Sequence, residues 1–411
     1  MNKALLTIIL ALMAVSAHSQ HALPNIEAHT ITSDILSADR DVLIYLPSGY
    51  DVHKDKHYPT LYIMDGQWYF YNGVAIQKTL RGELLLPEMI IVGINMPRPE
   101  RDSIYSYHWD EFRHFIRNEV VSFVDAKYRT SAERLLFGWE SSAALVTSLL
   151  FDDGSVFKGA IATNGTYITP EMTDAMARQT QGSKKHLYIA NTIKDIYNID
   201  ASNQSVAVLT QSNLPDLVWE YRLFDSEIHE SLAYVSIYEG LKFYYRNFAS
   251  LAFSSIDEFN AFGGIPEIRN YFIRRGDQFG LSTDVDSNTK NSLIWLAWRR
   301  DNFKAFQLFM TEFSEVLSTR RYASAYWQNR FGQFYLKHKD FDNSIHYFTQ
   351  GINLYPDDEY MALMYSGLAT AYQHKGNMKQ ARINYKQAVK AAEKNNDPKL
   401  ELYRSQLNGV K

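Results

Sequence analysis

The sequence predicts a doubly wound α/β domain followed by an all-α domain of helical repeats. The α/β domain is indicated by short apolar runs that alternate with segments of helical periodicity, and by a sharp strand-to-helix turn at residues 137–144. The all-α domain is indicated by a change to helix pairs from about residue 290. We therefore expect four parts along the 411 residues: a signal peptide, an α/β domain, a connecting segment and a helical domain, at 1–19, 20–248, 249–290 and 291–411.

The elements of the α/β domain are expected in the following order. Residues 41–46 form an apolar run closed by a Pro-Ser-Gly turn, and residues 58–64 form a second run stopped by Asp-Gly. Residues 89–94 are apolar on both faces, which is typical of a buried strand in a parallel sheet. A helix is expected at 109–128, because apolar side chains recur there at helical spacing. Further strands are expected at 134–137, 158–163 and 186–191, with helices at 141–150 and 232–245.

The helical domain contains two helix pairs whose internal offsets agree. Small and aromatic residues recur at equivalent places in 327–356 and 361–393, and both segments resemble tetratricopeptide repeats. A weaker pair ends near Phe303 and supplies the third unit that stacked repeats normally need. Such repeats form a concave surface that often holds a peptide or a partner's helix. We expect either a peptide or protein partner, or packing of the repeats on the first domain or in a dimer. The connecting segment is expected to contain a helix at 266–275.

The chain's first residues and its composition limit its function. Residues 1–19 combine Lys3, an apolar run and small residues at the cleavage positions, which is typical of a secretory signal peptide cut before Gln20. No later stretch is long and apolar enough to span a bilayer, so we expect a location outside the cytoplasm, either periplasmic or secreted. The absence of cysteine excludes disulfides and thiolate catalysis. A net charge of −4 without a basic stripe argues against nucleic acid as a partner, and no motif indicates a metal or other cofactor.

The turn at residues 137–144 has the shape of a nucleophile elbow with a glutamate at its tip. In the pattern Gly-x-Ser-x-Gly, the residues two before and two after the nucleophile must be small. Gly138 and Ser142 meet that demand around Glu140. If Ser141 were the nucleophile, the indole of Trp139 would stand at one of the small places. The sequence therefore puts a carboxylate where acyl transfer uses a hydroxyl.

Several motifs in the same order resemble the putative-esterase family of α/β-hydrolases, which includes siderophore esterases, feruloyl esterases and mycolyltransferases. The motifs are Met64-Asp65-Gly66, Val92-Gly93-Ile94 with Arg98 and Arg101 after it, Tyr128-Arg129-Thr130, Gly138 before Glu140, and Phe157-Lys158-Gly159-Ala160. The resemblance covers about residues 35–248. It implies a serine esterase ancestry, and therefore a carboxylic-ester hydrolase with a small-molecule ester or a related ligand.

The resemblance also implies the positions of functional residues. The catalytic histidine of the family matches His229. The triad acid follows the strand ending at Asn191, where Asp195 is the first choice and Asp200 the second. The order of nucleophile, acid and histidine fits the elbow. The remaining implied positions are backbone donors of an oxyanion hole at Gln67 and Ser141, and substrate-contacting side chains at Trp68, Arg98, Arg101 and Trp139.

Glu140 leaves three chemistries open. It could pair with His229 and hold the imidazole protonated, which would leave a charged but inert site, that is, a pseudoenzyme. It could itself attack an electrophilic carbon, as an aspartate does in some α/β-hydrolases. It could also hold a water with His229 for direct general-base hydrolysis. Rescue of serine chemistry by Ser141 or Ser142 is a further alternative, and a scaffold role through the helical repeats is another.

Overall fold

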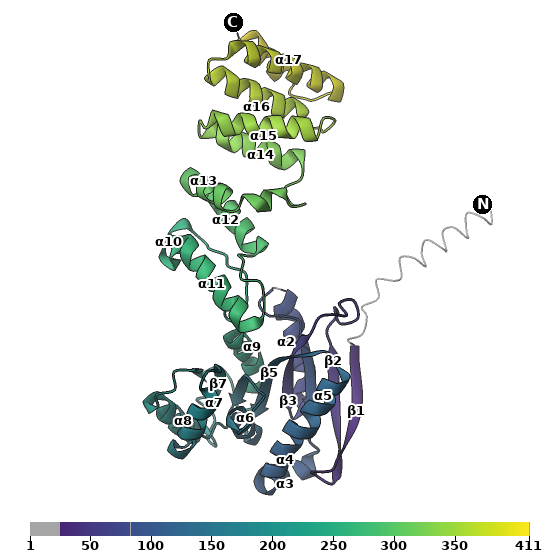
Figure 1. Ribbon diagram of the computed structural model, residues 1–411, viewed down its shortest axis with the longest axis vertical. Helices are drawn as coiled ribbons and strands as arrows, with labels where there is room; N and C mark the ends of the chain where they lie inside the picture. Colours follow the sequence, from purple (N-terminus) through teal and green to yellow (C-terminus); the bar gives the residue numbers. More distant parts are fainter. Residues whose placement is uncertain (1–24, 83, 411) are drawn as a thin grey trace, which may run out of the picture. The chain divides into compact units, whose positions relative to one another are not determined.

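The computed structural model describes residues 25–82 and 84–410, so the expected signal peptide lies outside the described residues. The chain divides into two compact units, Met1–Ala249 and Ser250–Lys411 (Figure 1). The boundary lies next to the end expected for the α/β domain, residue 248.

The first unit is built on one twisted sheet, whose eight strands in the described residues run in the order β1-β2-β4-β3-β5-β6-β7-β8. The two pairs formed by β1 with β2 and by β2 with β4 are antiparallel, and the remaining pairs are parallel. This arrangement confirms the predicted mostly parallel α/β sheet. The strands are β1 (Asn25–Ser33), β2 (Ala38–Leu46), β3 (Tyr58–Met64), β4 (Ile90–Ile94), β5 (Thr130–Trp139), β6 (Gly159–Thr163), β7 (Lys185–Thr192) and β8 (Leu217–Phe224).

Helices flank this sheet. Helices α2 and α9 contact each other, α2 packing on β3 and β4 and α9 on β6 and β7. Helix α6 packs on β5 and β6 and contacts α3, α4 and α7. The helical elements of this unit are α2 (Gly66–Gly82), α3 (Arg98–Tyr107), α4 (Trp109–His114), η1 (Phe115–Val120), α5 (Val121–Lys127), α6 (Ser141–Phe151), η2 (Pro170–Met172), α7 (Thr173–Thr180), α8 (Ile199–Gln211) and α9 (Leu232–Tyr244).

The sequence located the central strands but missed both edges of the sheet. Strands β1 and β8 pair on one side only, and they alternate exposed polar with partly buried residues instead of forming apolar runs. Helix α2 was also missed, because glycines that lower its helical propensity lie where it packs closely on the sheet. A Cβ on Gly66 would lie 2.6 Å from the backbone of Gly93 in β4. The helix expected at 109–128 exists, with a π-helical turn, η1, between α4 and α5.

The second unit is helical, and it begins earlier than expected. The segment 249–290 is not a separate connection, because helices α10 and α11 pack in one apolar core with α12, α13 and α14. Phe259, Ile268 and Phe272 of this segment are buried there. The helices are α10 (Ile256–Phe262), α11 (Gly264–Phe279), α12 (Ser287–Arg299), α13 (Phe303–Glu312), η3 (Ser314–Ser318), α14 (Ala325–Lys337), α15 (Phe341–Leu354), α16 (Met361–His374), α17 (Met378–Asn395) and α18 (Leu400–Asn408).

The helix pairs α14–α15 and α16–α17 are the predicted repeats. They stack through Phe348 of α15, which is fully buried. Its ring fills the space that a side chain would need at Gly332 of α14 and at Gly367 of α16. Small residues at these places therefore let neighbouring helices approach. Among residues 25–82 and 84–410, no helix is both long enough and apolar enough to cross a bilayer.

Candidate active site of the first unit

Glu140 occupies the tip of a sharp turn between β5 and α6. Its backbone has φ 57° and ψ −124°, a conformation that costs energy in a residue with a side chain. A Cβ on Gly138 would lie 2.1 Å from the carbonyl oxygen of Ser142, and a Cβ on Gly165 would lie 2.2 Å from that of Glu140. The turn therefore has the close packing of a nucleophile elbow, and the glutamate side chain is 35% exposed at its tip.

The carboxylate of Glu140 is paired with an arginine. Nη1 of Arg101 donates to Oε2 of Glu140 at 3.0 Å. Nε and Nη2 of the same guanidinium donate to the two carboxylate oxygens of Asp65, at 2.9 and 3.2 Å. The pair between Glu140 and His229, one of the alternatives that the sequence left open, is not formed, since Arg101 holds the carboxylate instead.

Burial affects the pKa values of both Asp65 and Arg101. Arg101 was expected only to line the substrate site, but its side chain is 8% exposed and that of Asp65 is fully buried. Burial raises the pKa of Asp65, although the hydrogen bonds and charge of Arg101 oppose that shift. Burial acts to lower the pKa of Arg101, but the hydrogen bond and charge of Asp65 outweigh it and raise that pKa overall. Asp65 thus fixes a permanently charged guanidinium beside Glu140.

The serines after Glu140 differ in environment. Ser142 is fully buried, and its hydroxyl oxygen accepts a hydrogen bond from the backbone N–H of Trp139 at 2.8 Å. The same hydroxyl has the carbonyl oxygen of Trp139 at 2.8 Å and Oδ2 of Asp65 at 3.2 Å as acceptors. Ser142 is therefore part of the turn's framework and cannot reach a substrate. Ser141 is exposed in the first turn of α6.

His229 lies against Asp195, at the end of the sheet where β7 finishes. Nδ1 of His229 is 3.3 Å from Oδ1 of Asp195, whose side chain is fully buried. That oxygen accepts hydrogen bonds from the backbone N–H groups of Tyr197, at 3.0 Å, and Asn198, at 3.3 Å, which fix its position. The second choice, Asp200, is exposed in the first turn of α8. The structure thus brings Asp195, the first choice, together with His229.

Two side chains hold the backbone of the histidine loop. The carbonyl oxygen of His229 accepts hydrogen bonds from Nε1 of Trp139, at 3.1 Å, and from Nδ2 of Asn164, at 2.8 Å. Asn164 is buried after β6 with φ 52°, and its Oδ1 accepts the N–H of Thr192 at the end of β7. The sequence analysis did not identify Asn164. Gly165, the small residue that follows it, could have indicated that the chain there packs closely against the elbow.

Aromatic rings join the two halves of the site. The ring of Trp139 is 4.9 Å from that of His229 and 6.3 Å from that of Trp68. Guanidinium groups approach the Trp68 ring at 5.3 Å for Arg98 and 5.5 Å for Arg101. Glu140, Arg101, Trp68, Trp139 and His229 are therefore linked through direct contacts, although they lie far apart in the sequence.

The two predicted oxyanion donors lie at helix N-termini. Gln67 is in the first turn of α2, and its side chain bonds both backbone groups of Met96 at 2.8 Å, which anchors that turn. Ser141 is the first residue of α6. N–H groups in the first turn of a helix have no intrahelical acceptor, so both positions can donate to a ligand. Within the described residues, no group of three or more His, Asp or Glu side chains is arranged to hold a metal ion.

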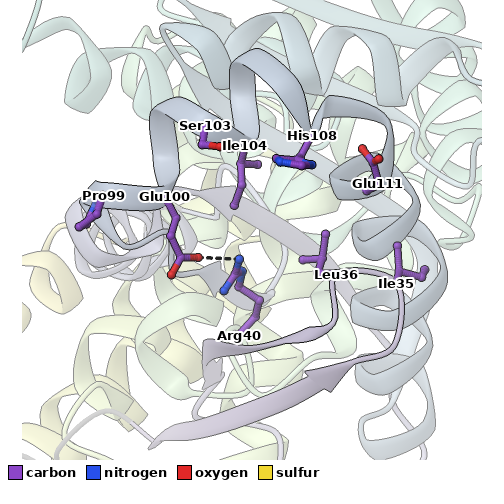
Figure 2. Close-up of a pocket in the computed structure, with 9 residues that line it drawn as sticks. All are labelled: Ile35, Leu36, Arg40, Pro99, Glu100, Ser103, Ile104, His108 and Glu111. Carbon is purple, nitrogen blue, oxygen red and sulfur yellow. Dashed lines mark ion pairs between the residues drawn. The ribbon is translucent and has the colours of Figure 1, made fainter.

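A separate cavity of about 520 Å³ lies between the turn that follows β1 and helix α3 (Figure 2). Figure 2 shows Arg40 and Glu100 paired beside it, with Nη2 2.7 Å from Oε2. None of the predicted site residues lines this cavity. Helix α3 nevertheless contains both Glu100, which lines the cavity, and Arg101, which binds Glu140.

These features define a class of protein: an α/β-hydrolase fold with a glutamate at its elbow, joined to helical repeats. Residues 33–162 match the family model described as putative esterase, and residues 321–394 match the one described as tetratricopeptide repeat. The first unit thus contains a putative-esterase domain and the second contains tetratricopeptide repeats, which confirms both predicted resemblances.

Solved structures share the fold, among them the following two. An uncharacterised protein from Capnocytophaga ochracea is 14% identical with a TM-score of 0.57, and the match covers 94% of this chain and 99% of that one. An IroE-like serine hydrolase from Shewanella oneidensis is 18% identical with a TM-score of 0.51, and the match covers 70% of this chain and 98% of that one. No curated protein matches the chain. At these identities the likeness to solved structures establishes the fold alone.

Proposed function

We propose that the first unit binds a small ester or a related ligand at the Glu140 site and does not carry out serine-type acyl transfer. One observation carries this proposal, namely the ion pair between Glu140 at the elbow tip and Arg101. The elbow, the histidine and the helix N-termini resemble those of a hydrolase site, but the residue at the nucleophile position is a carboxylate bound to a fixed cation.

Two physical consequences argue against acyl transfer. A carboxylate whose negative charge is engaged by a guanidinium is a weaker nucleophile and base than a free one. Glu140 directly precedes Ser141, and Arg101 joins its carboxylate to Asp65, two residues before Gln67, so the remaining negative charge belongs to the same part of the site as these N–H donors. An oxyanion that develops at those donors would be repelled by it, whereas a neutral serine would not repel it. The arrangement supports ligand binding more than turnover.

A second candidate is slow hydrolysis by an activated water, which the pairing of His229 with Asp195 favours. In this reaction His229 would take a proton from water while the water oxygen bonds to the ester carbonyl carbon. The carbon–oxygen bond to the alcohol would then break, and the alcohol would leave with the proton from His229. No acyl-enzyme would form, so the carboxylate of Glu140 would stay bound to Arg101.

The test compares the native protein with Glu140→Ser, using p-nitrophenyl acetate and p-nitrophenyl butyrate as substrates. We expect no burst of p-nitrophenol from the native protein, and a gain of about 100-fold or more in Glu140→Ser, which His229→Ala removes. Glu140→Gln is the matched control, since it keeps the size of the side chain without supplying a hydroxyl. A burst of product from the native protein, abolished by Glu140→Gln, would mean that the carboxylate is the nucleophile, and the proposal would fail.

We further propose that the second unit binds a protein or peptide partner and that the mature chain acts outside the cytoplasm. The match of residues 321–394 to tetratricopeptide repeats supports the first part, since stacked repeats commonly present a binding surface. The apolar run and cleavage pattern of residues 1–19 support the second. N-terminal sequencing of the protein recovered from cell fractions tests the location, and an uncleaved chain in the cytoplasmic fraction would contradict it.

A further inference from the structure

The cavity between the turn after β1 and helix α3 is large enough to hold a small molecule (Figure 2). Its volume of about 520 Å³ lies within the range of ligand pockets, about 300–1,000 Å³. Its walls come from that turn, from the start of β2, and from the successive helices α3 and α4. None of these walls contains Glu140 or His229, so the cavity is a second candidate site in the first unit.

Apolar side chains line the cavity from two sides. Ile35 and Leu36 of the turn are half-buried and pack on the apolar core, and Ile104 of α3 is 5% exposed. Figure 2 shows Leu36 and Ile104 on opposite sides of the cavity. The turn is anchored at Ile35, whose backbone N–H donates to Oε1 of Glu119 at 3.1 Å. It is also anchored at Leu36, whose N–H donates to Oγ of Ser33 at 2.9 Å. The cavity therefore offers a fixed apolar surface.

Arg40, the one arginine that lines the cavity, is already neutralised. Its Nη2 lies 2.7 Å from Oε2 of Glu100, as the dashed line in Figure 2 marks, and its side chain is 8% exposed. Its Nη1 donates to the carbonyl oxygen of Asp39 at 2.9 Å. An anionic ligand would have to displace Glu100 and would leave that carboxylate without its partner. The arginine is therefore committed to the protein.

The second carboxylate of the lining, that of Glu111, has no counter-charge. Among the ion pairs and side-chain hydrogen bonds of the described residues, none includes Glu111, Ser103 or His108. All three line the cavity. Since Arg40 and Glu100 cancel each other, Glu111 gives the cavity one negative charge in excess. The unpaired groups are also hydrogen-bond acceptors, because a hydroxyl and a neutral imidazole can each accept.

We propose that this cavity binds a small organic cation, namely a primary ammonium group on an apolar body. Glu111 is the charged contact, and Ser103 or His108 accepts a further hydrogen bond. An ammonium group suits these residues because it has three donors and no acceptor. The apolar body contacts the surface formed by the turn and α3. In the part of the chain that the structure describes, no three His, Asp or Glu side chains are arranged for a metal ion, so Glu111 is a single charged contact and not one of a set of metal ligands.

This inference does not depend on the ligand of Glu140 or on a partner of the second unit. Free amines and lysine side chains share the alkylammonium group. We assign the site to a free amine, because a cavity of this volume has room for a whole small molecule.

The experiment measures binding to the mature protein by isothermal titration calorimetry at neutral pH. n-Hexylamine is the probe, since it is an ammonium ion under these conditions. 1-Hexanol has the same apolar body without charge, and hexanoate has the opposite charge. Nα-acetyl-lysine methylamide stands for the lysine side chain of a partner. Circular dichroism checks that each variant is folded.

We expect hexylammonium to bind about tenfold more tightly than hexanol, and hexanoate not to bind. Glu111→Gln should weaken hexylammonium binding about tenfold, because it keeps the size of the side chain and removes its charge. Glu220→Gln is the matched control, since Glu220 is exposed on β8 and does not line the cavity. Ser103 is also exposed, so Ser103→Phe should fill the cavity and abolish binding without changing any charge.

Four results would overturn the inference. If hexanol binds as tightly as hexylammonium and Glu111→Gln has no more effect than Glu220→Gln, the cavity does not select a cation. If hexanoate binds more tightly, Arg40 is the charged contact and the ligand is an anion. If Ser103→Phe leaves hexylammonium binding unchanged, the cation binds elsewhere. If hexylammonium does not bind, the cavity is not a site for a free amine, and binding of the lysine derivative alone would assign it to a partner's side chain.

Discussion

Nη1 of Arg101 lies 3.0 Å from Oε2 of Glu140, while the other side of the same guanidinium is held by both oxygens of Asp65. The residue at the tip of the elbow is thus connected to the first turn after β3 through one buried side chain. This connection gives Glu140 a fixed partner before any ligand arrives.

Replacement of Arg101 should destabilise the first unit strongly. In Arg101→Met, Asp65 would stay buried without a cation, and breaking a buried pair in this way costs about 3–5 kcal/mol. Urea unfolding measures the loss. Arg98→Met is the control, because Arg98 is exposed and forms no ion pair in the described residues, and it should stay within about 0.5 kcal/mol of the native protein. Adding Asp65→Leu to Arg101→Met should recover part of the loss; no recovery would mean that the unpaired charge is not its cause.

The backbone of Glu140 makes an unusual prediction about glycine. At ordinary positions glycine is less stable than alanine by about 0.5–1 kcal/mol. At φ 57° and ψ −124° the order should reverse, so that Glu140→Gly exceeds Glu140→Ala in stability by about 1 kcal/mol. Both variants lose the same ion pair, so their difference isolates the backbone. Equal stabilities, or a more stable alanine variant, would show that the turn is not strained.

His186 should make the stability depend on pH. Burial lowers its pKa from 6.5 to about 4 in the folded protein, and Nδ1 makes no hydrogen bond in the described structure. Between pH 6.5 and 4 the unfolded chain therefore takes up a proton that the folded chain does not. The free energy of unfolding should fall as pH falls through this window, by up to about 3 kcal/mol from this residue.

Thermal unfolding of the native protein and of His186→Leu between pH 7 and 4 measures this dependence. The variant should lose less stability than the native protein over the same range. Parallel profiles would indicate that His186 takes up its proton at the same pH in the folded protein as in the unfolded chain.

The contact of Phe348 with two glycines should determine how stably the repeats stack. A Cβ on Gly367 would lie 2.3 Å from the Phe348 ring, so Gly367→Ala forces α15 and α16 apart and should cost about 1–3 kcal/mol. Gly409→Ala is the control, because its nearest neighbour would lie at an ordinary 3.6 Å. Hydrogen exchange should show faster exchange in α15 and α16 of Gly367→Ala alone. Unchanged exchange there would mean that the ring moves aside without cost.

The sequence by itself determined the fold class, the repeats and the identity of the residue at the elbow. Buried parallel strands and stacked helices leave apolar patterns of a fixed period, and the elbow leaves a glycine at a fixed offset. It did not determine the edge strands β1 and β8, because an edge needs only one apolar face. Nor did it show that 249–290 packs into the helical core, since short helices with polar connections look the same in sequence whether packed or not.

Only the tertiary structure decided the partners of the charged residues. Arg101 follows β4, Asp65 follows β3 and Glu140 follows β5, three neighbouring strands whose carboxyl ends meet at one edge of the sheet. Sequence separation says nothing of which of several carboxylates an arginine will reach. Burial and the direction of the side chains placed Arg101 between Asp65 and Glu140, and His229 beside Asp195. The buried carboxylate of Asp65 needs such a partner, because a buried charge is stable only when it is paired.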